Sequence, residues 1–202
     1  MILRIVRIAT AGILLLGISR LTAQPTGPEI PPSQMIRLRS IEAKTINSPE
    51  YSVDVRSESV KRDGSLKWLM VEAIYDTMPK WTDEITLTFY VVLEGKPEDL
   101  PEGAKKFNLF SGSVTVVNVP KTKEAETTMF LDPYTLARYG EPTHVAVVIN
   151  IDGQLAAGMA EPSSSAESQW WTKETPNQTP LLTRDKTPYA FVEIDKQNTI
   201  KP

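Results

Sequence analysis

The chain has 202 residues, with 22 basic and 25 acidic side chains, a formal net charge of −3, one histidine and no cysteine. This acidic balance argues against a nucleic-acid-binding protein, because phosphates select a basic face. The absence of cysteine excludes disulfide bonds and thiolate metal sites, and a single histidine leaves no familiar zinc or iron site.

Residues 1–23 have the pattern of a secretory signal peptide. Arg4 and Arg7 supply the positive start, and Ile8–Ile18 is the apolar run. Leu21-Thr22-Ala23 then predicts cleavage before Gln24, and the lack of a cysteine there argues against a bacterial lipoprotein. The alternative is a retained membrane anchor, although the apolar run is shorter than the ~20 residues that a span requires.

Cleavage at this point leaves a mature chain of about 180 residues, the size of one ordinary domain. The removed segment contains three arginines and no acid, which leaves 19 basic against 25 acidic residues, a charge of −6. This charge disfavours a membrane-surface protein. An exported eukaryotic domain of this size usually carries a disulfide. The lack of cysteine therefore favours an exported bacterial protein of the periplasm, the outer surface or the medium.

Three regions follow the signal peptide. Gln24–Ser33 has four prolines in ten residues, which predicts an extended and flexible segment. Residues 34–161 carry regular strand patterns and form the predicted folded domain. Residues 162–202 form a C-terminal extension.

The folded domain is predicted to contain about eight strands. Two of them carry an irregularity. Near Arg39-Ser40 the apolar residues change from even to odd positions, which indicates a β-bulge. The small residues Ser111-Gly112-Ser113 indicate a bend or bulge in the other strand. Leu66–Thr77 has apolar residues at both even and odd positions, which is typical of a strand covered on both faces. The expected strands are Met35–Ile46, Tyr51–Val55, Leu66–Thr77, Glu84–Leu93, Phe107–Val119, Thr127–Leu131, Val145–Ile151 and Leu155–Met159.

A short helix is expected between the strands Thr127–Leu131 and Val145–Ile151. Asp132 is a good N-cap, Pro133 suits the first helical position, and Gly140 suits the position after the last turn. The strand that follows alternates strictly, and Asp152-Gly153 is a tight hairpin signal with Leu155, Ala157 and Met159 on one face of its partner strand. A helical crossover of this kind passes a chain between two packed sheets.

These elements predict an all-β fold, an immunoglobulin-like or fibronectin-like β-sandwich with one short crossover helix and a C-terminal extension. The cysteine pair and the strand tyrosine that specify the immunoglobulin topology are absent, so the sequence leaves the strand order open.

The extension is too apolar for a disordered tail, because it contains Trp170, Trp171, Leu181-Leu182 and Phe191. We expect it to fold back, to add a last strand at residues 189–194 and to cover the second face of Leu66–Thr77. The alternative is a free arm that docks on a partner protein.

One stretch of the extension supports a family resemblance. Thr179–Phe191, with the sequence TPLLTRDKTPYAF, resembles the C-terminal signature of small exported proteins of Verrucomicrobia and Akkermansia-type bacteria associated with pilus-like gene clusters. That resemblance implies an immunoglobulin-like sandwich at the cell surface or in the periplasm. It implies no catalytic or ligand-binding residue.

No motif of the chain predicts catalysis. His144 is the only histidine and falls on the less apolar parity of its strand, while Ser163–Ser165 and Ser168 are ordinary loop serines. The carboxylates lack the spacing of a calcium loop, and no glycine-rich phosphate loop follows a strand. We therefore predict no catalytic residue, no cofactor and no metal site.

The remaining functional candidates are aromatic. Trp81, Trp170 and Trp171 are the candidate contacts for a partner protein or a glycan, and a platform of these three with Trp68 would suit sugar stacking. The favoured alternative is that these tryptophans pack in the core and against the extension, because large aromatic side chains dominate protein cores. The leading hypothesis is a non-enzymatic structural or interaction protein of the bacterial cell envelope, part of a pilus-like or adhesion-related assembly with other envelope proteins. The alternative is a carbohydrate-binding module that uses surface tryptophans to bind host or surface glycans.

Overall fold

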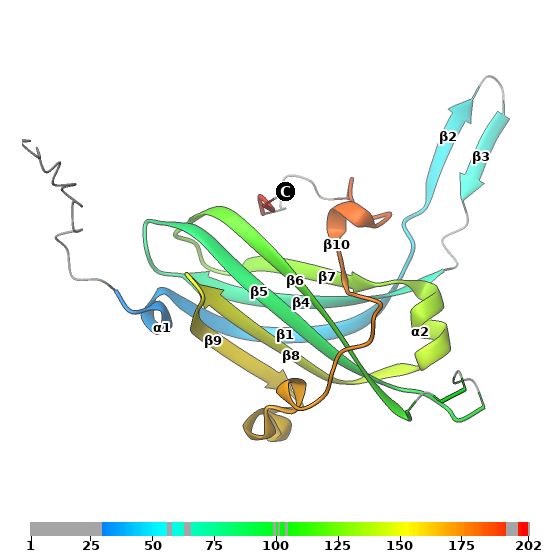
Figure 1. Cartoon of the computed structure of the whole chain (residues 1–202). Helices are drawn as coiled ribbons and strands as arrows, with labels where there is room; N and C mark the ends of the chain where they lie inside the picture. Colours follow the sequence, from blue (N-terminus) through cyan, green and yellow to red (C-terminus); the bar gives the residue numbers. More distant parts are fainter. Residues whose placement is uncertain are drawn as a thin grey trace, which may run out of the picture.

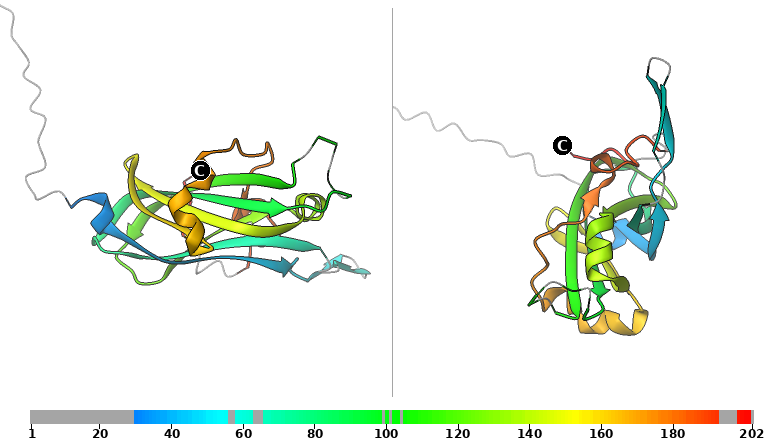
Figure 2. Two further views of the ribbon diagram at one scale, coloured as in Figure 1. Left: turned by 90° about the horizontal axis from the view of Figure 1, so that it is seen from below. Right: turned by 90° about the vertical axis from the view of Figure 1, so that its right-hand side faces the viewer.

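Two four-stranded antiparallel sheets form a sandwich in the computed structural model (Figures 1 and 2). The structure describes residues 30–55, 58–62, 66–98, 100, 102–103, 105–192 and 198–201. The predicted signal peptide and most of the proline-rich segment lie outside these residues. Among the described residues, no helix has the length and apolar character needed to cross a bilayer.

The first sheet has the order β1-β4-β7-β10, and the second has the order β6-β5-β8-β9. A separate hairpin of β2 and β3 projects from the sandwich (Figure 1). The strands are β1 (Ile36–Asn47), β2 (Tyr51–Val55), β3 (Glu58–Arg62), β4 (Lys67–Thr77), β5 (Trp81–Glu94), β6 (Phe107–Pro120), β7 (Ala125–Leu131), β8 (Glu141–Ile151), β9 (Gln154–Glu161) and β10 (Leu182–Thr183). The described helices are α1 (Pro32–Met35), α2 (Pro133–Tyr139), η1 (Ser163–Ser168), η2 (Trp170–Thr172) and η3 (Arg184–Lys186).

The core lies between the two sheets and follows the predicted alternation. From Ile85 to Leu93, the odd-numbered side chains of β5 are fully buried and meet those of β4 across the interface. The inward residues of these two strands are Ile85, Leu87, Phe89, Val91 and Leu93, and Leu69, Val71, Ala73 and Tyr75. The even-numbered residues of β5 therefore face outward, and this outer face carries the site described below.

The crossover helix forms as the sequence predicts. The Asp132 carboxylate accepts hydrogen bonds from the backbone N–H groups of Tyr134 and Thr135, both at 3.0 Å, and α2 begins at Pro133. Gly140 ends the helix with φ of +91°, a conformation that favours glycine. The helix carries the chain from β7 in the first sheet to β8 in the second.

The bulge near Arg39 is confirmed, because the register with β4 shifts between Leu38 and Ser40. Arg39 Nε donates a hydrogen bond of 2.6 Å to Asp76 Oδ1, and this bond holds the pKa of the Asp76 carboxyl below its usual value. The hairpin at Asp152-Gly153 is also confirmed, since both residues have positive φ.

Three strand predictions are corrected by the structure. Residues 58–62, for which no strand was expected, form β3, and with β10 of the extension the described residues contain ten strands. The register between β8 and β9 shifts beside Ala156, so Ala156 points into the core and Leu155 is 65% exposed. The ladder between β5 and β6 runs without a shift past Gly112, so the predicted bulge there is wrong.

The last strand of the extension also differs from the prediction. It lies at β10, where Leu182 and Thr183 pair with Phe130 and Met129 of β7, and residues 188–192 form turns. The remainder of the predicted strand, residues 193 and 194, lies outside the described residues.

The extension runs along the open side of the sandwich (Figures 1 and 2). The backbone N–H groups of Asn177 and Leu181 donate to carbonyl groups of β6 at 2.7 and 2.9 Å. Leu181 is buried in the main core, opposite Gly112. After β10, the chain returns to β6 through a bridge between Ile200 and Val116.

Tyr189 anchors the extension on the outer face of the first sheet. Its ring stacks on Phe130 with centroids 5.0 Å apart and meets the edge of Trp68 at 6.2 Å. Its hydroxyl donates to the carbonyl of Asn47 at 2.6 Å. This cluster covers the second face of β4, and Met70 completes it.

We predict that Gly112→Ala destabilises the fold by about 1–3 kcal/mol, the usual range for overpacking. An added Cβ would lie 2.7 Å from both the Cβ and the carbonyl oxygen of Leu181. Thermal unfolding measures the effect, and Gly158→Ala is the matched control because its nearest atom would be 3.8 Å away. Equal stability of the two variants would contradict a close contact between β6 and the extension.

We predict that stability falls as the pH rises from about 10 to about 12, because burial raises the pKa of Tyr189 to about 12. The folded state retains this proton where the unfolded chain loses it, so the group costs at most ~2–3 kcal/mol in this window and nothing below it. Urea unfolding at several pH values measures the slope. Tyr189→Phe should reduce the slope, while the contribution of Tyr75, whose pKa burial also raises, should remain.

Candidate functional site

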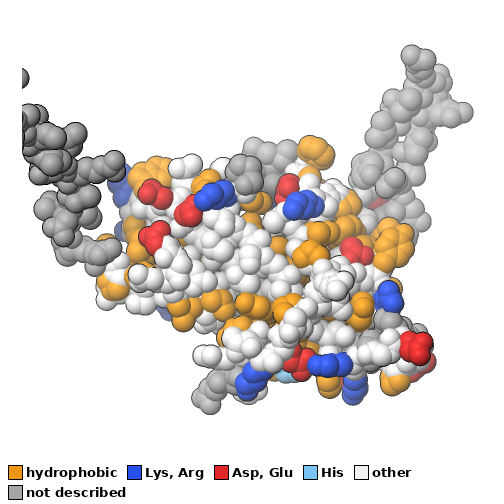
Figure 3. Space-filling view, in the orientation of Figure 1, with side chains coloured by type: hydrophobic (Ala, Val, Ile, Leu, Met, Phe, Trp, Pro, Cys, Tyr) orange, Lys and Arg blue, Asp and Glu red, His pale blue; other side chains and the backbone are white. Residues whose placement is uncertain are grey.

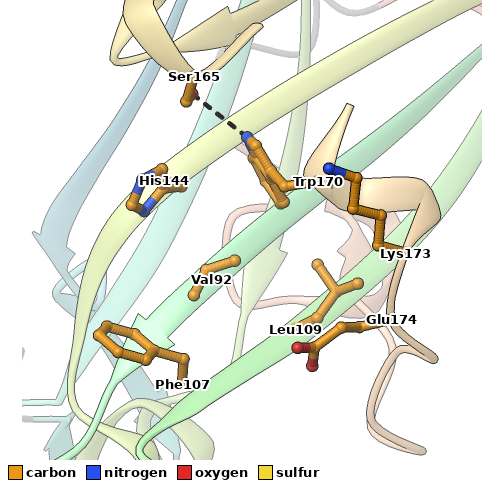
Figure 4. Close-up of a pocket in the computed structure, with 8 residues that line it drawn as sticks. All are labelled: Val92, Phe107, Leu109, His144, Ser165, Trp170, Lys173 and Glu174. Atoms are coloured by element: carbon orange, nitrogen blue, oxygen red, sulfur yellow. Dashed lines mark hydrogen bonds between the residues drawn. The ribbon is translucent and has the colours of Figure 1, made fainter. Parts of the chain in front are cut away.

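A pocket lies on the outer face of the second sheet, where the extension crosses the ends of β5, β6 and β8 (Figure 4). Its volume is about 330 Å³, at the lower end of the range for small-ligand sites. The lining residues are Val92, Phe107, Leu109, His144, Ser165, Trp170, Lys173 and Glu174. We call it the Trp170 pocket.

Strand register builds the floor of the Trp170 pocket. Val92 of β5 pairs with Leu109 of β6 on one side and with His144 of β8 on the other. Because the flanking residues Val91, Phe110 and Val145 face the core, these three side chains face outward together. The floor is therefore mainly apolar, with one imidazole beside it.

The extension supplies the wall. Trp170 lies edge-on to the His144 ring with centroids 5.8 Å apart, and its Nε1 donates to Ser165 Oγ at 3.3 Å. Two 3-10 helices, η1 and η2, position Ser165 and Trp170. Phe107 is 46% exposed at the start of β6, with Lys106 Nζ 5.1 Å from its ring centroid.

Charges of both signs surround the rim, and Figure 3 shows basic and acidic side chains together along this edge of the molecule. Glu174 forms an ion pair of 3.2 Å with Lys105, and Glu94 forms one of 2.6 Å with Lys106. Lys173 is exposed and has no ion-pair partner within the described part of the chain. An apolar pocket with a charged rim can bind a ring or an aliphatic group that carries a charge nearby.

His144 serves as a packing group in this arrangement. Its Nδ1 lies 3.1 Å from Thr143 Oγ1, and its ring packs against Trp170. Ser165, the nearby hydroxyl, donates to the carbonyl of Pro162 at 2.6 Å. Within the described residues, no carboxylate bonds to His144, and no cluster of three or more histidine, aspartate or glutamate side chains could hold a metal.

The four tryptophans do not form one platform, and Trp68 packs against the extension as the favoured alternative predicted. Trp68 is 8% exposed and belongs to the Tyr189 cluster. Trp81 is 60% exposed at the far end of β5, and a strand of this length places it ~36 Å from Val92. The structure brings Trp170 and Trp171 together with their rings perpendicular at 88° and 5.5 Å, and Trp171 lies 6.4 Å from Tyr90 at 32°.

Sequence reasoning missed Val92, Phe107, Leu109 and Lys173 as site residues. A signal was present, because Val92 is the one aliphatic residue in an outward row of β5 that otherwise reads Glu84, Thr86, Thr88, Tyr90 and Glu94. An apolar residue on a polar face indicates a surface that another segment covers.

The comparisons with known proteins fit this structure. A protein-family model matches residues 31–202. The crystal structure of a protein from Akkermansia muciniphila is similar with a TM-score of 0.66 and 20% identity, over 83% of this chain and 93% of that chain. At this identity the likeness establishes a shared fold. The shared fold agrees with the sandwich that the resemblance of Thr179–Phe191 to Akkermansia-type proteins implied. No curated protein sequence matches the chain.

We predict that p-cresol, the free equivalent of a tyrosine side chain, binds saturably in the Trp170 pocket. Nuclear magnetic resonance should show shifts of the Trp170 indole and the His144 ring, because both line the pocket. The exposed Trp81 indole is the internal control and should not shift. Trp170→Ala should weaken the binding at least about tenfold, the usual effect of losing an aromatic anchor. Shifts at Trp81 alone would contradict a specific pocket.

Proposed function

We propose that this chain, which belongs to the family whose model matches residues 31–202, is an exported non-enzymatic interaction protein of the bacterial cell envelope. We infer that it takes part in a pilus-like or adhesion-related surface assembly with other envelope proteins. The signal-peptide pattern of residues 1–23 and the fold shared with an Akkermansia muciniphila protein support this proposal.

The Trp170 pocket is the observation that carries the proposal. Its wall comes from the extension, a segment that a two-sheet sandwich does not require for its fold. Its lining is largely apolar. The chain's single histidine packs against that wall rather than bonding to an acid. The arrangement suits the binding of a partner side chain better than proton transfer.

A carbohydrate-binding role is the second candidate. The 32° angle between the rings of Tyr90 and Trp171 favours it, because sugars stack on exposed ring faces. The perpendicular Trp170 and Trp171 rings oppose it, since they do not extend that surface into a flat platform. A glycan array probed with the wild type and Trp171→Ala tests this role, and binding lost in the variant would establish it.

The leading proposal is tested with a photo-crosslinking amino acid at position 173, on the pocket rim, in cells of a bacterium that produces the protein. We expect crosslinks to envelope proteins that decrease in a Trp170→Ala background, because that variant removes the pocket wall. Lys80, exposed at the far end of the sandwich, is the matched control position.

Cell fractionation and N-terminal sequencing accompany the crosslinking. We expect the protein outside the cytoplasm with Gln24 as its first residue. A cytoplasmic protein that retains residues 1–23, or equal crosslinking from positions 80 and 173, would overturn the proposal.

A further inference from the structure

The geometry points to a second copy of this chain as the occupant of the Trp170 pocket, with Phe191 of one molecule entering the pocket of the next. This inference rests on the proposed function, because it identifies a partner for the same pocket. It depends on three observations: an exposed aromatic side chain, its location on the face opposite the pocket, and the fit between the two surfaces.

Phe191 is the most exposed large hydrophobic residue in the described part of the chain, at 86%. It does not lie on a loose tail. Tyr189, two residues earlier, is buried against Phe130 and Trp68, and the backbone N–H of Val192 donates to the Tyr189 carbonyl at 3.0 Å. Phe191 thus stands at the corner of a turn whose base is fixed. A ring held in this way loses little conformational entropy when it binds.

The pocket and Phe191 lie on opposite faces of the sandwich. Trp68 and Phe130 belong to the outer face of the first sheet, since their neighbours Leu69 and Leu131 face the core. Val92 and Leu109 belong to the outer face of the second sheet. Packed sheets are ~10 Å apart, so a Phe191 tethered at Tyr189 cannot reach the pocket of its own molecule. Only another copy can supply it.

The pocket suits a phenylalanine ring in size and chemistry. A volume of about 330 Å³ accommodates one aromatic side chain, and Val92 and Leu109 provide an apolar floor. Trp170 lines the pocket, where its indole can pair with an incoming aromatic ring. The sequence after Phe191 contains Glu193, Asp195 and Lys196, a net charge of −1, which is opposite in sign to Lys173 on the rim.

A contact between two different faces has a consequence for assembly. Each molecule would use its Phe191 on one neighbour and its pocket on another, which is a heterologous contact. Such contacts propagate into an open row unless the rotation between copies closes a ring. The proposed contact therefore supplies a mechanism for a surface assembly made from this chain alone.

Sedimentation velocity of purified residues 24–202 over a range of concentrations tests the inference. The wild type should form a series of oligomers. Phe191→Ala and Trp170→Ala should each remain monomeric at concentrations at least about tenfold higher, as expected for loss of an aromatic hot spot. An equimolar mixture of the two variants should form dimers and nothing larger, because only one intact pocket and one intact Phe191 can meet.

Trp81→Ala is the matched control, since it removes another exposed aromatic residue and should associate like the wild type. Lys173→Glu reverses the charge on the rim without altering the apolar lining and should weaken association. Circular dichroism and thermal unfolding verify that each variant is folded, and Phe191→Ala removes only an exposed side chain.

A monomeric wild type, an unchanged series in Phe191→Ala, or large oligomers in the mixture would overturn the inference. These failures differ from failure of the proposed function. Crosslinks from position 173 to a different envelope protein, together with a monomeric wild type, would reject the second copy as occupant and leave the interaction role in place.

Discussion

The structure depends on the packing of Tyr189 against Phe130 and Trp68. This contact joins the end of the chain to the outer face of the first sheet, and the Tyr189 hydroxyl bonds to the end of β1. With Leu181 buried opposite Gly112, it fixes the path of the extension at two points. The wall of the Trp170 pocket and the turn that presents Phe191 both belong to segments that these anchors hold in place.

Much of the fold follows from local patterns in the sequence. The alternation of β5 and β8, the Asp132 cap, the Asp152-Gly153 turn and the bulge at Arg39 each reflect backbone or burial constraints that act over a few residues. The errors arose where a distant segment decides the outcome. The small residues around Gly112 predict a bend or bulge, but they instead make room for Leu181, which lies far along the chain. The bulge at Ala156 turned Leu155 outward for a similar reason, since only the register with β8 reveals it, whereas Ala157 and Met159 pack against the core as predicted.

The site was harder to predict than the fold for the same physical reason. Trp170 and Trp171 were identified by residue type, but their neighbours Val92, Leu109 and His144 come from three strands whose order the sequence left open. Trp68 and Trp81 look alike in sequence, yet one is buried beneath Tyr189 and the other stands exposed at a strand end. The tryptophans in the sequence therefore indicated a binding surface, but the order of strands in the sheets determines which of these rings lie together on it.

The C-terminal position of the Tyr189 anchor has a consequence for the order of folding. The hydrogen bond from Tyr189 to Asn47 spans 142 positions of the chain, and contacts of such high sequence separation form late. Until Tyr189 is available, the outer aromatic face of β4 and the edges of β6 and β7 remain uncovered. A chain that emerges N-terminus first therefore completes this packing only when residues 181–189 have emerged.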